Sequence, residues 1–364
     1  MFSLPSIRLP AQAESIWQYG IWILILIATS GLHSICGSFV RAKEKLRVYA
    51  ITGILNTVCN VLLMVLFLEF LGLGIGGYML AVIIADLISI SFLAVSAKLW
   101  QFIHFKRLHL PTAKSMVKFS IPLIPATISW WIITMSDRYM IWLFIGSSAN
   151  GIYSVAAKIP SIVTILASVF MEAWHVSIIG TKTEQSRFFS NIMRSYQSLL
   201  FIAAGLVTML SRFIITLMTS PDYYEAWQYV PLLLCSTVFS CLATFIGSIY
   251  TVEKKSVSQL VTTLIGAATN IVLNLVLIPR FGISGAAIAT FISFIRLIDT
   301  RKYIVVHWSP VRFCISFVLL MIQIAVMVND WGAVYVIQSV CLAGLIAVNF
   351  SPLLSGMKKL IRLK

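Results

Sequence analysis

The chain has 364 residues, of which 59% are hydrophobic and only 11% are charged, and its formal net charge is +15. A soluble domain contains about 25% charged residues, and a chain this apolar could not cover its surface with polar groups. The composition therefore excludes a soluble enzyme, a disulfide-stabilised secreted domain and a nucleic-acid-binding module. It predicts an all-α, polytopic membrane protein.

Eleven membrane-spanning helices are predicted from the hydrophobic runs and the breaks between them. A span takes about 20 apolar residues, and stretches such as 51–71 and 311–328 reach that length. Glycine and proline mark several breaks, as at 72–77, Pro221 and 279–282, because the chain turns there at the lipid boundary. In chain order, the predicted spans are 16–40, 48–70, 77–98, 119–143, 152–175, 192–217, 228–250, 257–278, 284–299, 309–328 and 332–350.

Most of the 27 Lys and Arg residues fall in alternate connections between these spans. One cluster of four, for example, follows the first span at 41–47, whereas Asp222 and Glu225 occupy the connection after the sixth. Basic residues resist translocation and stay on the cytoplasmic side of a membrane. The pattern predicts an N-terminus outside and a C-terminus in the cytoplasm, and it explains the positive charge without nucleic acid as a partner.

An internal repeat relates the first three predicted spans to the seventh, eighth and ninth. With an offset of 210 residues it aligns Gly37 with Gly247, Lys45 with Lys255, Asn60 with Asn270, Leu63 with Leu273, and Gly72 with Gly282. Three more spans precede the second copy and none precedes the first, so the pattern predicts that three helices are absent from the front of the chain. Repeats on this scale place a transporter's substrate site at the interface between them.

Two stretches resemble Wzx-type polysaccharide flippases of the multidrug/oligosaccharidyl-lipid/polysaccharide (MOP) exporter superfamily. The first combines Ile121-Pro-Leu-Ile-Pro, Asp137-Arg138-Tyr-Met-Ile and Gly151-Ile-Tyr-Ser-Val-Ala-Ala-Lys158, and the second runs over 270–289. The resemblance implies two lobes of six helices followed by two extra helices. Residues 1–118 would be a partial first lobe, 119–300 the complete second lobe, and 301–364 the extra pair with a basic tail.

The resemblance also implies a function. The chain would flip an undecaprenyl-pyrophosphate-linked oligosaccharide across a bacterial inner membrane by alternating access, for O-antigen, capsule or exopolysaccharide assembly, and would not be an enzyme. The expected partners are the lipid-linked oligosaccharide, membrane lipids and the polysaccharide polymerase and chain-length machinery. Na⁺ or H⁺ would be the coupling ion, with no other cofactor. A chain lacking three helices of its first lobe is not expected to transport by itself.

Cationic side chains inside the membrane are the first candidates for binding a pyrophosphate, because an unused charge in lipid costs a few kcal/mol. Lys158 lies inside a predicted span and could bind phosphate as a point charge; the alternative is that it snorkels to the outer interface. Asp137 and Arg138 are neighbours near the end of another span and do not face each other on a helix. A structural role is favoured for this pair over binding of the pyrophosphate or sugar.

Other polar and aromatic residues inside the spans are also candidates. Asp86 is either a coupling-ion site or a buried, satisfied acid. Asn60, Asn270 and Asn274 are predicted to form interhelical hydrogen bonds with a structural role. Trp130 and Trp131 lie at mid-span, where they either line a sugar-binding cavity or pack between helices. No metal site is predicted, because neither the histidines nor the six cysteines have metal-ligand spacing.

Three other functions compete with the flippase hypothesis. A membrane O-antigen polymerase or ligase would carry a large outer loop, but the predicted outer connections are short. A MATE-like drug exporter would need acidic cavity residues. The candidates include the cationic Lys158 and Arg138 beside the acidic Asp86, and this balance favours an anionic substrate over a cationic drug. An inactive, truncated flippase is the third alternative.

Overall fold

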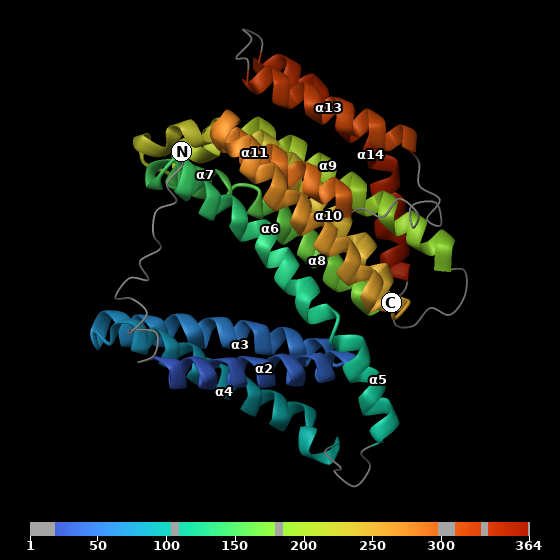
Figure 1. Ribbon diagram of the computed structural model, residues 1–364. Helices are drawn as coiled ribbons and strands as arrows, with labels where there is room; N and C mark the ends of the chain where they lie inside the picture. Colours follow the sequence, from blue (N-terminus) through green and yellow to red (C-terminus); the bar gives the residue numbers. More distant parts are fainter. Residues whose placement is uncertain (1–18, 103–108, 179–184, 298–309, 329–333, 363–364) are drawn as a thin grey trace. The chain divides into compact units, whose positions relative to one another are not determined.

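The computed structural model describes residues 19–102, 109–178, 185–297, 310–328 and 334–362, which form helices and turns without a strand (Figure 1). A backbone in lipid must satisfy its own N–H and C=O groups, and a helix does so within one segment. In these ranges nine helices are long and apolar enough to cross a membrane, and a pair of helices bent by 45° makes a tenth candidate. The chain is a multi-pass membrane protein.

The chain divides into two compact units, Met1–Leu110 and Pro111–Lys364. The described part of the first unit contains α2 (Gly20–Ala42), α3 (Leu46–Met64) with a π-helical extension over Val65–Phe70, α4 (Gly74–Ala97) and a short 3₁₀ turn over Leu99–Phe102. The helix α4 packs against both α2 and α3. Val40, Leu93 and Ala97 form a small buried core at one end of this unit.

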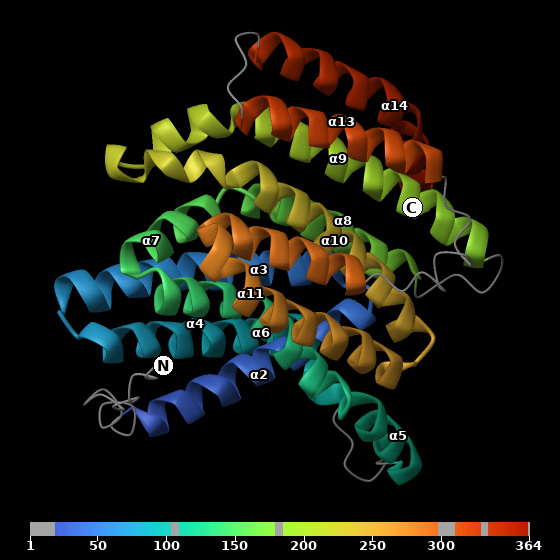
Figure 2. The same cartoon turned by 45° about the horizontal axis from the view of Figure 1, so that its top comes forward.

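The second unit contains the larger hydrophobic core. Its described elements are α5 (Leu110–Ser120), α6 (Leu123–Phe144), α7 (Ser147–Ala156), α8 (Ser161–Ile178), α9 (Gln185–Met218), the 3₁₀ segment Pro221–Gln228, α10 (Val230–Val252), α11 (Ser256–Leu297), α13 (Pro310–Val328) and α14 (Val334–Arg362). The helix α11 packs on α6 and α10, while α13 and α14 pack together and against α9 (Figure 2).

The residues of α11 form two antiparallel arms instead of one straight helix. Gly282 leaves the helical conformation with φ 59° and ψ −138°, and a Cβ atom at Gly285 would lie 2.3 Å from Leu277 O. Asn270 Nδ2 lies 3.2 Å from Thr290 Oγ1, whereas a straight helix would separate these residues by about 30 Å. The eighth and ninth predicted spans are therefore the arms of a tight hairpin.

One predicted span differs from the observed helices. The segment 152–175 is not a single helix, because α7 ends at Ala156 and α8 begins at Ser161 with a 45° bend between them. Pro160 lies in this break, and its missing N–H favours interruption of the helical hydrogen bonds. If α7–α8 counts as one bent span and the α11 hairpin as two, the described segments follow the order of the eleven predicted spans.

The 210-residue repeat is visible in the backbone of each unit. Glu44 and Lys254 both have left-handed φ angles, 60° and 56°, and so do Gly72 and Gly282, at 61° and 59°. The N–H of Lys45 bonds to Val40 O, and the N–H of Lys255 bonds to Tyr250 O. The same turns thus recur at the same offset, which supports the sequence alignment of the two segments.

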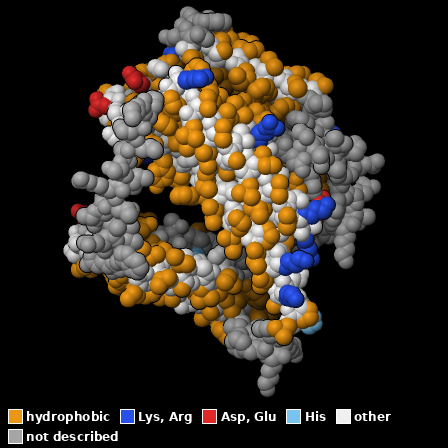
Figure 3. All heavy atoms as spheres, viewed as in Figure 1, with side chains coloured by type: hydrophobic (Ala, Val, Ile, Leu, Met, Phe, Trp, Pro, Cys, Tyr) orange, Lys and Arg blue, Asp and Glu red, His pale blue; other side chains and the backbone are white. Residues whose placement is uncertain are grey.

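Apolar side chains cover most of the described surface in the view of Figure 3, and Lys and Arg side chains are few there. Leu24, Ile54 and Phe70 are among many large hydrophobic residues that are more than half exposed. A water-soluble monomer rarely exposes extended apolar patches. Lipid is therefore the solvent that this surface fits.

Candidate functional site

Asp137 lies at the centre of a buried network of neutral polar side chains in the second unit. It comes from α6 and is only 1% exposed. Tyr153 Oη of α7 donates a hydrogen bond to Asp137 Oδ2 over 2.7 Å, and Asn274 Nδ2 donates to Oδ1 over the same distance. Thr290 Oγ1 also donates to Oδ2, and Asn270 Nδ2 lies 3.3 Å from Oδ1. The site thus joins α6, α7 and both arms of α11.

The electrostatics of this network are unusual for a buried carboxylate. Within the described ranges no basic side chain forms an ion pair with Asp137, so neutral donors alone surround it. Asn274 Oδ1 is buried and accepts no hydrogen bond there, while Asn270 Oδ1 accepts from Ser136 and Asn274. Carboxylate, amide and hydroxyl oxygens are the ligands that a hard cation prefers. The network can therefore hold either a cation or a proton on the carboxylate.

Asp86 occupies a second buried polar cluster, in the first unit. It is 5% exposed; Ser30 Oγ donates to its Oδ2 over 2.5 Å, and Asn56 Nδ2 donates to its Oδ1 over 3.1 Å. His33 Nδ1 lies 3.2 Å from the same Oδ1. Unlike Asp137, this carboxylate contacts a side chain that can itself carry positive charge. Of the two readings left open by the sequence, these partners favour a satisfied acid.

Lys158 lies in the bend between α7 and α8, and its side chain is exposed. Its backbone oxygen accepts hydrogen bonds from the N–H and the hydroxyl of Ser161, which hold the bend. No acidic side chain pairs with it in the described part of the chain. Arg138 is half-buried, and it forms no ion pair with Asp137 in the described part of the chain.

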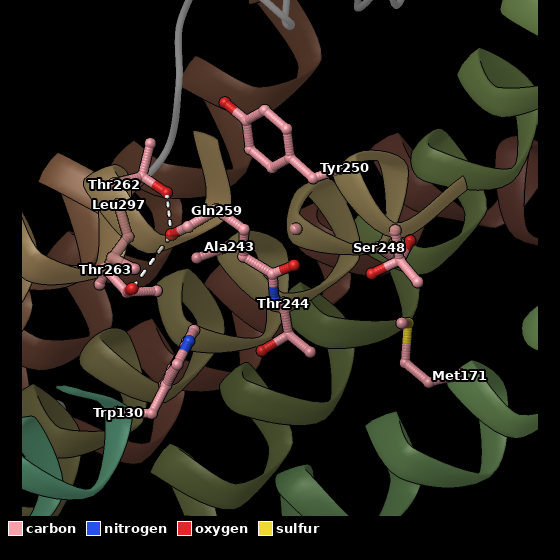
Figure 4. A pocket seen from close by; sticks show the side chains of 12 residues that line it. Trp130, Met171, Ala243, Thr244, Ser248, Tyr250, Gln259, Thr262, Thr263 and Leu297 are labelled. Atoms are coloured by element: carbon pink, nitrogen blue, oxygen red, sulfur yellow. Dashed lines mark hydrogen bonds between the residues drawn. The ribbon is translucent and has the colours of Figure 1, made fainter. Parts of the chain in front are cut away.

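The two adjacent tryptophans of α6 have different environments. Trp131 is 56% exposed. Trp130 is half-buried, packs against Phe294 with ring centroids 5.6 Å apart, and lines a cavity of about 200 Å³. Side chains of α6, α8, α10 and α11 surround this cavity, with Trp130 and Thr263 on one side and Ser248 and Met171 on the other (Figure 4).

The cavity and the Asp137 network lie on the same helix faces, two turns apart. Side chains separated by two turns share one face and are about 10 Å apart along the axis. Three such pairs connect the cavity to the network: Trp130 and Asp137 on α6, Thr263 and Asn270 on the first arm of α11, and Leu297 and Thr290 on its second arm. A shift of these helices at the cavity would therefore also move the side chains of the Asp137 network.

The sequence identified part of this site. Asn270 and Asn274 form the predicted interhelical bonds, but Asn60 Oδ1 is buried and accepts no hydrogen bond among the described residues. The sequence does not single out Tyr153 and Thr290, which contact Asp137, or His33, which contacts Asp86 in the first unit. The spacing of Asn270 and Asn274, one turn apart on one face, is the sequence signal that could have pointed to a polar site.

Comparison with known proteins defines the fold class. Residues 12–175 match the family model described as polysaccharide biosynthesis protein. An outward-facing multidrug resistance MATE family transporter of the MOP superfamily is similar with 11% identity and a TM-score of 0.61, over 84% of this chain and 69% of that one. The Vibrio cholerae MATE transporter VcmN in its bent form is 12% identical with a TM-score of 0.60, over 93% and 72% of the two chains.

A third solved structure, the lipid II flippase MurJ in an inward closed conformation, is 17% identical with a TM-score of 0.50, over 91% of this chain and 73% of that one. No curated protein sequence matches the chain. These likenesses show that the chain shares the fold of these membrane transporters.

Proposed function

We propose that this protein flips a lipid-linked oligosaccharide across a bacterial inner membrane by alternating access, for the assembly of O-antigen, capsule or exopolysaccharide. The observation that carries the proposal is the match of residues 12–175 to a polysaccharide biosynthesis family on a chain with a transporter fold. The similarity to a protein described as a lipid II flippase adds support, because that substrate is also a lipid-linked saccharide. The polysaccharide polymerase and chain-length machinery would be its partners.

Lys158 is proposed as a cation for the pyrophosphate. A diphosphate crossing a membrane needs positive charge that is not already neutralised, and the exposed Lys158 side chain has no acidic partner in the described ranges. Lys158 follows directly after α7, the helix that contributes Tyr153 to the Asp137 network. The broken span α7–α8 thus carries both the proposed phosphate-binding Lys158 and Tyr153, which bonds to the buried Asp137 of α6.

Asp137 is proposed as the site of the coupling ion, Na⁺ or H⁺. Transport of the lipid-linked glycan against its concentration gradient requires an energy source, and transporters built from repeats hold their coupling ion near the substrate site. Asp137 suits this role better than Asp86, because Asp137 has neutral partners and an unused amide oxygen at Asn274. Either ion would complete a buried carboxylate that otherwise lacks compensating charge.

A MATE-like drug exporter is the second candidate function. Two similar structures are MATE transporters, and a buried carboxylate is a feature that a cation exporter could use. The exposed Lys158 weighs against this candidate, because a cationic drug would be repelled by it.

Complementation tests the two functions together. Against the expectation that a chain lacking three helices does not transport by itself, the proposed function predicts that expression of this chain in a bacterial strain lacking its own flippase restores surface glycan, measured by gel and lectin binding. The same cells, made sensitive by deletion of their drug exporters, should gain no resistance to cationic drugs. Drug resistance without restored glycan would contradict the flippase and support the exporter. Expression in the membrane is checked in parallel with an affinity tag.

A further inference from the structure

The cavity beside Trp130 is lined by hydroxyl, amide and aromatic side chains and carries no charged side chain. Thr244, Thr262 and Thr263 each donate their hydroxyl proton to a backbone oxygen of their own helix. A threonine oxygen keeps two lone pairs after its proton is used. Gln259 also lines the cavity, and its Oε1 is enclosed and accepts no hydrogen bond among the described residues. The walls therefore suit a polar, uncharged ligand, and their threonine oxygens can accept hydrogen bonds from its hydroxyl groups.

Size and aromatic lining restrict that ligand further. The volume of about 200 Å³ is smaller than a typical pocket for a drug-sized ligand and equals about six or seven liquid waters. This is the scale of one sugar ring. A half-buried tryptophan at the wall offers an apolar face to the C–H groups of such a ring, while the acceptors face its hydroxyls.

The internal repeat indicates that the cavity is a specific feature of the second unit. Gly247 and Gln259 line it, and their counterparts 210 residues earlier are Gly37 and Tyr49. In the first unit the Tyr49 ring fills the equivalent space, since a Cβ on Gly37 would lie 3.3 Å from Tyr49 Cε2. No atom lies within 4 Å of the corresponding position at Gly247. The shorter, polar Gln259 therefore leaves a cavity in the second unit at the place that Tyr49 fills in the first.

We propose that this cavity is a saccharide subsite that holds one neutral sugar residue of the transported lipid-linked glycan. The identity of the ligand rests on the function proposed above, while the acceptor-rich cavity is independent of it. Tyr250, Thr251 and Gln259 of its wall lie within two turns of the α10–α11 connection. That connection carries Lys254 and Lys255, and basic connections are predicted to be cytoplasmic. The subsite would therefore be occupied from the cytoplasmic side.

Direct binding of free sugars tests the subsite. The full chain, purified in lipid nanodiscs, is examined by saturation-transfer NMR with glucose, galactose and N-acetylglucosamine as separate probes, at about 10 mM because single rings bind weakly. We expect saturation transfer to at least one sugar. Trp130→Leu should weaken it about fivefold or more, through loss of the aromatic face. Gln259→Tyr should abolish it, because it installs the residue that fills the same space in the first unit.

Matched controls separate binding from folding. Trp131→Leu changes the neighbouring, exposed tryptophan, and Thr269→Val removes a hydroxyl of the same arm of α11 that bonds to Ile265 O outside the cavity. Both should bind sugar as the wild type does. Absence of saturation transfer from all three sugars, or an undiminished signal in both cavity variants, would overturn the subsite. Gel filtration checks the fold of each variant, and Gln259→Tyr remains informative if Trp130→Leu does not fold.

Complementation of surface glycan distinguishes failure of the subsite from failure of the proposed function. If the wild type restores glycan and both cavity variants do so equally well, the subsite is wrong while the flippase function stands. If the wild type restores no glycan but sugar binding still depends on Trp130 and Gln259, the flippase function is wrong and the sugar site stands.

Discussion

Asp86 and Asp137 are the acidic residues buried in the described ranges, and they differ in their hydrogen-bond and ionic partners. Asp86 contacts the imidazole of His33, whereas Asp137 is surrounded by hydroxyl and amide groups only. A carboxylate held by neutral donors keeps its charge uncompensated, and a bound cation or proton would remove that cost. These partners are consistent with a structural role for Asp86 and with the ion site that we propose at Asp137.

Removing the charge of Asp137 should remove the response to the ion. Asp137→Asn keeps an oxygen that can accept from Tyr153 and Thr290, so we expect the variant to fold. A ligand bound only by the folded state stabilises it, by about 2.7 kcal/mol at 100 times its Kd. The unfolding temperature of the purified wild type should therefore rise with added NaCl over matched KCl, or with falling pH if the ligand is a proton.

This response should vanish in Asp137→Asn and persist in Asp86→Asn. A shift of equal size in Asp137→Asn would place the ion elsewhere.

Lys158 provides the second prediction at this scale. Lys158→Ala should lower restored surface glycan about tenfold or more, since a hydrogen bond to a charged group contributes about 1.5–3 kcal/mol. Lys158→Arg should retain part of the activity because it keeps the charge. Lys114→Ala, which removes an exposed lysine of α5, serves as the control and should restore glycan normally. Full complementation by a normally expressed Lys158→Ala protein would exclude the pyrophosphate role.

At the scale of elements, the α11 hairpin brings the site together. It places Asn270 and Asn274 on one arm opposite Thr290 on the other, and α6 packs along both with Asp137. The turn depends on the positive φ of Gly282 and on the bare backbone of Gly285. Because the arms also line the cavity two turns away, the hairpin is the element through which ion and sugar binding would influence each other.

Gly285→Ala should destabilise the hairpin by about 2 kcal/mol or more, because the added methyl group has no room beside Leu277 O. Gly247→Ala is the matched control: it lies in the interior of α10 with no atom within 4 Å of its Cβ. Alanine is favoured over glycine in helices by about 1 kcal/mol, so this variant should be as stable as the wild type or more stable. Unfolding in detergent micelles, followed by circular dichroism, measures both. Equal stability of the two variants would contradict the close approach of the arms.

At the scale of the whole molecule, the alternation of basic connections leads to a topology prediction. In a cysteine-free background, Lys114→Cys should be protected from a membrane-impermeant maleimide in intact cells, and Asp222→Cys should react. Replacing the six native cysteines is reasonable because all of them are free. Labelling of Cys at 114 but not at 222 in intact cells would reverse the orientation.

Much of the fold was predictable from local sequence. The length of an apolar run and the glycine or proline that ends it are local properties, so the order of the spans agrees with the described helices, apart from the break at 157–160. The repeat was also readable, because Gly72 and Gly282 meet the same backbone requirement in both copies. Asp137, Trp130, Asn270 and Asn274 stand out in the sequence itself, because they are polar or aromatic residues within apolar spans.

The partners of those residues were decided only by the tertiary structure. Tyr153 and Thr290 are ordinary residues in the sequence, and Thr290 reaches Asp137 from 153 positions away. In a membrane, helices apolar on every side carry little information on which face meets a neighbour, because lipid and protein are equally apolar surroundings. By itself the sequence therefore determined that the chain enters a membrane and where it turns. The packing of α6 against the α11 hairpin decided which buried polar groups meet, and it also left the cavity beside Gln259 that we propose as a sugar subsite.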